Sequence, residues 1–170
     1  MGEAMLSGDE RAALIRQYAA GPARLRAALE AVPATALRWR PAPGVWSAHE
    51  IVVHCGDAET AGALRIRFLV ADHDPLIVGY DEAAWATALD YHALPLEPAL
   101  AAAEAARANT LPLLERLPDD AWARAGRHSA SGRYSAEDWL RIYGVHLEAH
   151  AQQIEANVAA WEARQRSAAG

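Results

Sequence analysis

Apolar residues recur three and four positions apart along four long stretches of the chain, which is the spacing of one helix face. The stretches cover residues 8–32, 47–70, 98–117 and 135–164, and proline-rich or glycine-containing segments separate them. Alanine, the strongest helix former, dominates the apolar residues. We therefore predict an all-α fold, a four-helix bundle in which residues 1–170 form one domain and residues 165–170 form a frayed tail.

Serines mark the expected starts of three of these helices. Ser7 and Ser47 each lie three positions before a glutamate, which is the spacing of a capping box. Ser135 is the predicted N-cap of the fourth helix. The serines therefore predict where three of the four helices begin.

Prolines and glycines indicate where the helical pattern is disturbed. Gly21-Pro22 predicts a kink or a short break in the first helix, and Pro112 predicts a kink in the third. Residues 76–94 are expected to form an irregular crossover with a short helix around residues 82–89. A loop through Gly126 and Gly132 is expected to lead to the fourth helix.

The composition excludes several classes of protein. A formal net charge of −6 argues against a nucleic-acid partner. No apolar run approaches the roughly 20 residues of a membrane span, and residues 1–11 lack the pattern of a secretory signal. All 16 basic residues are arginine, so lysine-dependent catalysis is excluded. The single cysteine, Cys55, cannot form an internal disulfide, and we expect a cytoplasmic protein.

Three histidines form the strongest chemical pattern. His146 and His150 lie four residues apart on the fourth predicted helix, so their imidazoles share a face and could bind one ion. A solvated helix face would give the same spacing. His54 lies in an apolar run of the second helix, as a third ligand or as a core histidine. Glu50 and Asp57 flank it at helical spacing and could orient a ligand imidazole, with Asp57 favoured, or could be ordinary surface charges.

Two motifs in the right order resemble the signature of the DinB/YfiT-like superfamily. The first is WRPAPGVWSAHEIVVH, residues 39–54, with Asp57 and Glu59 after it. The second is His146-xxx-His150-xx-Gln153-Ile154. Weaker similarities occur at residues 18–22, 79–85 and 128–132, so the resemblance spans nearly the whole chain.

This resemblance implies a fold, a metal and a kind of chemistry. The family fold is a four-helix bundle with up-down-down-up topology, and its long crossover would correspond to residues 71–97. The family's metal ligands correspond to His54, His146 and His150. One divalent ion is expected, zinc or nickel, with manganese or iron as alternatives. Characterised members include transferases and isomerases that use bacillithiol or mycothiol.

Other polar residues are candidates for supporting roles. The catalytic residues are unknown, and the candidates are Glu50, Asp57, Tyr143 and His128. Cys55 is interpreted as a small buried hydrophobe, since one step along a helix turns it about 100° from His54. His49, His73 and His92 are interpreted as solvated loop or cap residues. An anion-binding role for Arg65 or Arg67 is a further hypothesis.

The sequence leaves three functions open. The first is a metal-dependent S-transferase that transfers a low-molecular-weight thiol to a small electrophile, because no convincing protein nucleophile is present. The second is a metal-dependent hydrolase that uses water. The third is a non-enzymatic metal-binding stress-response protein. The expected partners are a small-molecule substrate, a low-molecular-weight thiol and a second copy in a homodimer, with neither nucleic acid nor membrane.

Overall fold

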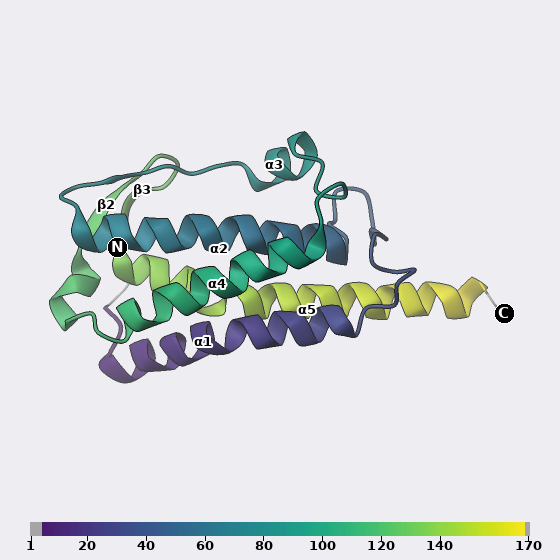
Figure 1. Cartoon of the computed structure of the whole chain (residues 1–170), viewed down its shortest axis with the longest axis horizontal. Coiled ribbons are helices and arrows are strands. Elements are labelled where there is room, and N and C mark those ends of the chain that lie inside the picture. Colours follow the sequence, from purple (N-terminus) through teal and green to yellow (C-terminus); the bar gives the residue numbers. More distant parts are fainter. Residues whose placement is uncertain (1–4, 169–170) are drawn as a thin grey trace.

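Four long helices lie side by side and form a bundle in the computed structural model, which describes residues 5–168 (Figure 1). They are α1 (Gly8–Glu30), α2 (Ala48–Ala71), α4 (Leu96–Leu114) and α5 (Ala136–Ala168). In Figure 1, α1 and α5 run in one direction, and α2 and α4 run in the other. The up-down-down-up topology is therefore confirmed, with the crossover joining the parallel pair α2 and α4.

The helices begin close to where the serines predicted. Ser7 and Ser47 both complete capping boxes with the glutamate three positions later. Ser135 accepts from the backbone N–H of Asp138, whose carboxylate accepts from the backbone N–H of Ser135. The ends differ more, because α4 stops at Leu114 rather than residue 117 and α5 continues to Ala168 rather than residue 164. Residues 165–168 of the predicted frayed tail are therefore helical, and residues 169–170 lie outside the described residues.

The two prolines lie inside helices that remain unbroken. Pro22 lies within α1, so the short break considered at Gly21-Pro22 does not occur. Pro112 lies in the last turn of α4, where its missing N–H removes the hydrogen bond to the carbonyl of Ala108 and only Leu113 and Leu114 follow it in the helix. The crossover contains α3 (Glu82–Ala88), which confirms the short helix predicted there.

A small sheet occupies the segment that was predicted to be a loop before the fourth helix. A 3₁₀ turn, η1 (Asp119–Ala123), leads to β2 (Ala125–His128) and β3 (Gly132–Ser135), which pair antiparallel. β1 (Leu76–Ile77), from the crossover, pairs parallel with β2. Strands of two and four residues are too short to show a period of two, so the all-helical prediction missed them.

The two largest apolar clusters of the described residues follow one another along the bundle axis. One contains Tyr18, Ile66, Leu69, Leu114, Trp122, Trp139, Leu140 and Tyr143, and the other contains Leu25, Ile51, Val52, Cys55, Leu100, Leu147, Ala151 and Ile154. Between their positions on α2 and α4 lie the buried polar residues Glu59 and Arg107. Within residues 5–168, no helix combines the length and the apolar character needed to cross a membrane.

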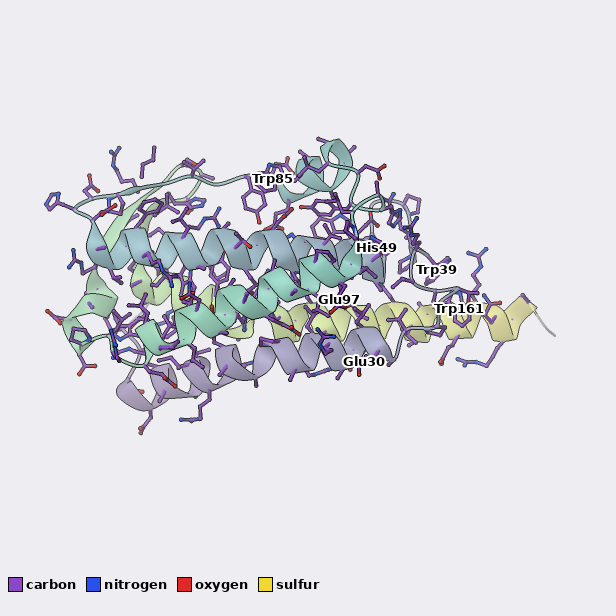
Figure 2. The ribbon with its side chains drawn as sticks, in the orientation of Figure 1. Glu30, Trp39, His49, Trp85, Glu97 and Trp161 are labelled. Atoms are coloured by element: carbon purple, nitrogen blue, oxygen red, sulfur yellow. The ribbon has the colours of Figure 1, made fainter. Side chains whose placement is uncertain are left out.

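The crossover lies over the outer face of α2 (Figure 1). Trp85 of α3 points from the crossover toward α2 (Figure 2), where it lines apolar grooves together with Ala61 and Leu64. The crossover also contributes Glu82, whose carboxylate lies near His54. The crossover between α2 and α4 therefore places a carboxylate close to His54 of α2.

Replacing Gly62 with alanine tests the close packing of α2 against α5. A Cβ at Gly62 would overlap the ring of Tyr143, so the ring or the helix must move. We expect Gly62→Ala to lower the free energy of unfolding by about 1–3 kcal/mol, measured by chemical denaturation. Gly8→Ala is the control, because nothing lies within 4 Å of a Cβ there. Equal stability of the two variants would contradict this packing.

Candidate metal centre

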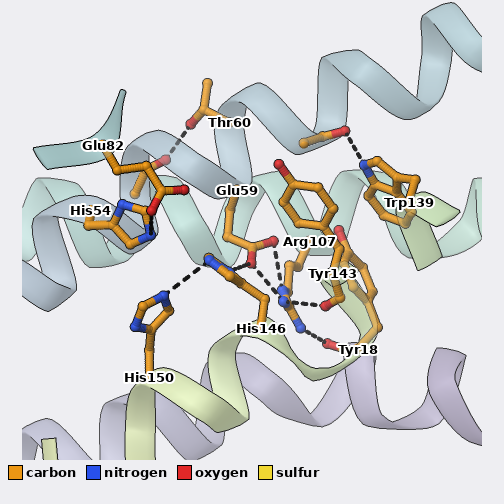
Figure 3. Close-up of polar contacts among 12 residues, drawn as sticks. Tyr18, His54, Glu59, Thr60, Glu82, Arg107, Trp139, Tyr143, His146 and His150 are labelled. Atoms are coloured by element: carbon orange, nitrogen blue, oxygen red, sulfur yellow. Dashed lines mark hydrogen bonds and ion pairs between the residues drawn. The ribbon is translucent and has the colours of Figure 1, made fainter. Parts of the chain in front are cut away.

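The bundle brings His54 of α2 together with His146 and His150 of α5 (Figure 3). One ring nitrogen of each histidine lies within 4.8 Å of those of the other two. The imidazoles therefore converge from two facing helices, as metal ligands commonly do in helix bundles. We call these three residues the histidine cluster.

The two histidines of α5 present their Nε2 atoms to the cluster. The Nδ1 of His146 donates to Oε1 of Glu59 at 2.8 Å, and the Nδ1 of His150 donates to Oε1 of Gln153 at 3.0 Å. With the proton on Nδ1, each Nε2 carries a free lone pair. These two Nε2 atoms are 3.2 Å apart, close to the roughly 3.3 Å between nitrogens that ligate one tetrahedral zinc ion.

His54 is the most deeply buried member of the cluster. Its side chain is 1% exposed, and among the described residues neither ring nitrogen has a hydrogen-bond partner. Trp46 packs against it with ring centroids 4.8 Å apart. An unpartnered buried polar group is costly, and a bound cation would satisfy it. The donor set therefore fits a divalent metal ion.

The surroundings keep two of the imidazoles neutral. Burial and then the neighbouring imidazoles of His150 and His146 lower the pKa of His54 to about 3. Burial and then His146 lower the pKa of His150 to about 4, although the hydrogen bond to Gln153 opposes this. Metal ligation requires the neutral form of imidazole.

A buried ion pair between Glu59 and Arg107 contacts His146. Both oxygens of Glu59 accept hydrogen bonds from Arg107 of α4, at 2.8 Å from Nε and 2.6 Å from Nη2. Both side chains are almost fully buried. Burial raises the pKa of Glu59, but the hydrogen bonds from His146 and Arg107 outweigh it and lower the pKa overall. Glu59 is therefore an ionised acceptor that orients the His146 ring.

The proline in α1 explains why Arg107 fits at this position. Pro22 has no N–H, so the carbonyl of Tyr18, four residues earlier, loses its helical donor. Arg107 supplies the replacement, with its Nη1 2.6 Å from that carbonyl oxygen. Gly21 leaves the space, because a Cβ there would overlap the guanidinium. The Gly21-Pro22 pair, expected to disturb the helix, instead accommodates this arginine.

The predicted carboxylate partners of the ligand imidazoles were wrong. Asp57 accepts a hydrogen bond from the Tyr91 hydroxyl at 2.7 Å, and Glu50 pairs with Arg40 and caps α2 through Ser47. The prediction considered only neighbours of His54 on its own helix. Glu59 instead supports His146, and which helices face each other decides that contact. Glu59 was part of the family-like motif, but its partner could not be identified from spacing.

The other candidates divide between the site and the scaffold. Tyr143 and His128, both candidate catalytic residues, line a cavity beside His146. Cys55 is fully buried, as predicted, and burial raises the pKa of its thiol. His73 is exposed, as predicted.

Two histidines interpreted as solvated belong to the scaffold. His49 is buried, and its Nε2 lies 2.9 Å from the carbonyl of Leu94, so that interpretation was wrong. His92 is partly buried, and its Nε2 lies 2.8 Å from the hydroxyl of Ser47. These contacts tie the start of α2 to the end of the crossover.

Glu82 is the site residue that sequence reasoning missed. Its Oε2 lies 3.9 Å from Nε2 of His54, and its side chain is 55% exposed (Figure 3). Asp81 caps α3 and so fixes the position of Glu82 in the first turn. With His146, Glu82 lines a cavity of about 200 Å³. The signal available in the sequence was its place in the weak family-like stretch 79–85.

Removing one cluster histidine should sharply reduce metal binding. We expect His54→Ala, His146→Ala and His150→Ala each to abolish stoichiometric binding of zinc or nickel at micromolar protein, because two ligands leave an incomplete site. Isothermal titration calorimetry on protein without a histidine tag measures this. His73→Ala is the matched control and should bind like the wild type. Full binding by His54→Ala would rule out a site shared between α2 and α5.

Glu59→Gln tests the support of His146. We expect the metal affinity to fall by roughly 10–100-fold, because the amide is a weaker acceptor for the imidazole N–H. Asp57→Asn, two residues earlier on α2, is the control and should keep the wild-type affinity. Circular dichroism on both variants checks that they are folded. If Glu59→Gln binds the metal as tightly as the wild type, Glu59 has a purely structural role.

Two named proteins are similar in sequence to this chain. A relative from Oceanobacillus iheyensis is 30% identical over 65% of this chain, and the match spans 64% of its own length, just under two thirds. A relative from Geobacillus kaustophilus is 27% identical over 78% of this chain and 75% of its own length. Both carry names that mark them as candidate metal-dependent hydrolases.

A solved structure agrees with the fold. YfiT from Bacillus subtilis, described as having an unusual four-helix bundle topology, superposes with a TM-score of 0.84 at 23% identity, over 92% of this chain and 90% of its own. The model of the DinB superfamily matches residues 17–154, which include all three cluster histidines. The chain belongs to the DinB superfamily.

Proposed function

We propose that this protein is a divalent-metal-dependent hydrolase whose nucleophile is water. One observation carries the proposal: the histidine cluster opens beside a cavity that also holds the carboxylate of Glu82. Among the described residues, the cluster comprises three histidines, which leaves a coordination position available. The names of the relatives from Oceanobacillus and Geobacillus support metal-dependent hydrolysis.

The ligand set favours zinc or nickel. Imidazole nitrogens suit zinc, nickel, copper and iron, whereas manganese prefers oxygen ligands. A divalent ion held there would supply Lewis acidity, polarising a carbonyl and making water nucleophilic near neutral pH. His54, His146 and His150 would hold the ion, and Glu59 and Gln153 would keep the two α5 rings in orientation.

Glu82 is the proposed general base. At 3.9 Å from Nε2 of His54, its carboxylate is close enough to act through one water molecule but lies outside the group of cluster atoms. Its oxygen would take a proton from the attacking water and return it to the leaving group.

We expect the nucleophile to come from outside the protein chain. Cys55 is fully buried and its thiol pKa is raised, so it is a poor nucleophile. Water and an external thiol are the two candidate nucleophiles. The names of the relatives fit water better, so thiol transfer is the second reaction to assay rather than the first.

Glu82→Gln should separate catalysis from metal binding. We expect kcat for ester or amide hydrolysis to fall by about 10²–10⁴-fold while zinc stoichiometry is unchanged, because the amide cannot accept the proton. Activity on a panel of small esters and amides, with and without metal, measures this. Glu162→Gln, an exposed carboxylate near the far end of α5, is the control.

The same assays contain the outcomes that would contradict the proposal. Metal-dependent turnover only when bacillithiol, mycothiol or glutathione is added would assign a transferase. Metal binding without turnover in either assay would favour the non-enzymatic function. Full hydrolytic activity in Glu82→Gln would remove Glu82 from the mechanism while leaving the hydrolase proposal intact.

A further inference from the structure

The cavity beside the histidine cluster contains an arginine as well as a glutamate. It has a volume of about 200 Å³ and is lined by Ala58, Arg65, Glu82, His128, Ser131, Tyr134, Ile142, Tyr143 and His146. Drug-sized ligands usually occupy roughly 300–1,000 Å³. The cavity therefore suits a small substrate, or the small end of a larger one.

Arg65 lies in this cavity without a carboxylate partner among the described residues. Its Nη1 donates to the Tyr143 hydroxyl at 3.2 Å, and its Nη2 donates to the carbonyl of Val78 at 2.8 Å. Both acceptors are neutral. By contrast, the more deeply buried Arg107 has the carboxylate of Glu59. The positive charge of Arg65 is thus not neutralised by direct contact.

The guanidinium is nevertheless held in place. Its Cζ lies 5.4 Å from the centroid of the Tyr80 ring, within the range of a cation–π contact. The two hydrogen bonds anchor the guanidinium to two different elements, since Tyr143 is on α5 and Val78 is in the crossover. Five N–H donors are available in a guanidinium, so donors remain for a ligand. An arginine positioned in this way is suited to binding a planar anion.

The charge balance also favours an anion. Arg65 contributes a positive charge to the cavity and Glu82 contributes a negative one. These two cancel formally, so a divalent ion at the histidine cluster would make the region positive. His128, which burial and then Arg65 shift to a lower pKa, adds no charge near neutral pH.

We propose that Arg65 binds a carboxylate group of a small substrate whose scissile bond faces the histidine cluster. This inference rests on the hydrolase proposal and adds the class of substrate, a small ester or amide that carries a free carboxylate. The apolar side chains of Ala58 and Ile142 line the rest of the cavity. Tyr143 lies between Arg65 and the histidine cluster. Its hydroxyl accepts a hydrogen bond from Arg65, and the centroid of its ring lies 5.6 Å from that of the His146 ring.

Binding of a bare carboxylate tests the inference without requiring catalysis. We titrate full-length, metal-free protein with propionate and with its neutral amide, propionamide, and follow tyrosine and histidine resonances by NMR. We expect propionate to shift Tyr143, Tyr134 and His128 and to bind at least roughly tenfold more tightly than propionamide, because a charge-assisted hydrogen bond is stronger than a neutral one. Equal affinities would overturn the inference.

Two variants of α2 assign the effect to Arg65. Arg65→Gln should weaken propionate binding by roughly tenfold or more, and Arg65→Lys should retain part of it. Arg67→Gln is the matched control, since Arg67 instead donates to Ala63, Asn109 and Thr110 and does not line the cavity. Unchanged binding by Arg65→Gln would contradict the assignment. Tighter binding of inorganic phosphate than of propionate would contradict the carboxylate specificity.

Steady-state kinetics test whether the anion site at Arg65 takes part in the reaction. With zinc-loaded protein, Arg65→Gln should raise KM for an ester bearing a carboxylate by roughly tenfold more than it raises KM for the neutral counterpart. If no ester is hydrolysed but propionate still depends on Arg65, the hydrolase proposal fails and the anion site stands. If both esters are hydrolysed with equal loss in Arg65→Gln, the anion site fails and the hydrolase proposal stands.

Discussion

The carboxylate of Glu59 joins the core of the bundle to the histidine cluster. One of its oxygens accepts from both Arg107 and His146, and the other accepts from Arg107 alone. Through these bonds α2, α4 and α5 meet at one buried point, and Arg107 extends the network to the Tyr18 carbonyl of α1. The orientation of the His146 ring therefore depends on how all four long helices pack.

Such an arrangement ties stability to the geometry of the site. Burying two opposite charges is costly, and the cost is offset here because nearly every donor and acceptor of the pair is used. Loss of either partner alone would leave a buried charge and cost about 3–5 kcal/mol. The pair also lies between the two apolar clusters, where it links α2 to α4. A rigid support of this kind suits a metal site, which requires ligands held in fixed positions.

The sequence predicted most of this architecture, and the failures share a physical cause. Helical periodicity and serine caps predicted the four long helices, and histidine spacing with the family resemblance predicted the cluster. The residues that contact the cluster were not predictable in the same way. Glu59 of α2 bonds to His146 of α5, and Glu82, which lies near His54 of α2, belongs to the crossover. Helical spacing defines neighbours on one helix, whereas these contacts depend on tertiary packing. The short strands around Gly126 were not predicted for a related reason. They are stabilised by pairing with β1, which no local sequence pattern indicates.

The central claim is that three imidazoles bind one divalent ion at the junction supported by Glu59. X-ray absorption spectroscopy on untagged, purified protein loaded with zinc or nickel tests it most directly. The account predicts one metal per chain, with three imidazole nitrogens at about 2.0–2.1 Å, one further light-atom ligand and no sulfur. A thiolate ligand, which could come only from Cys55 within this chain, or fewer than three imidazoles would contradict it.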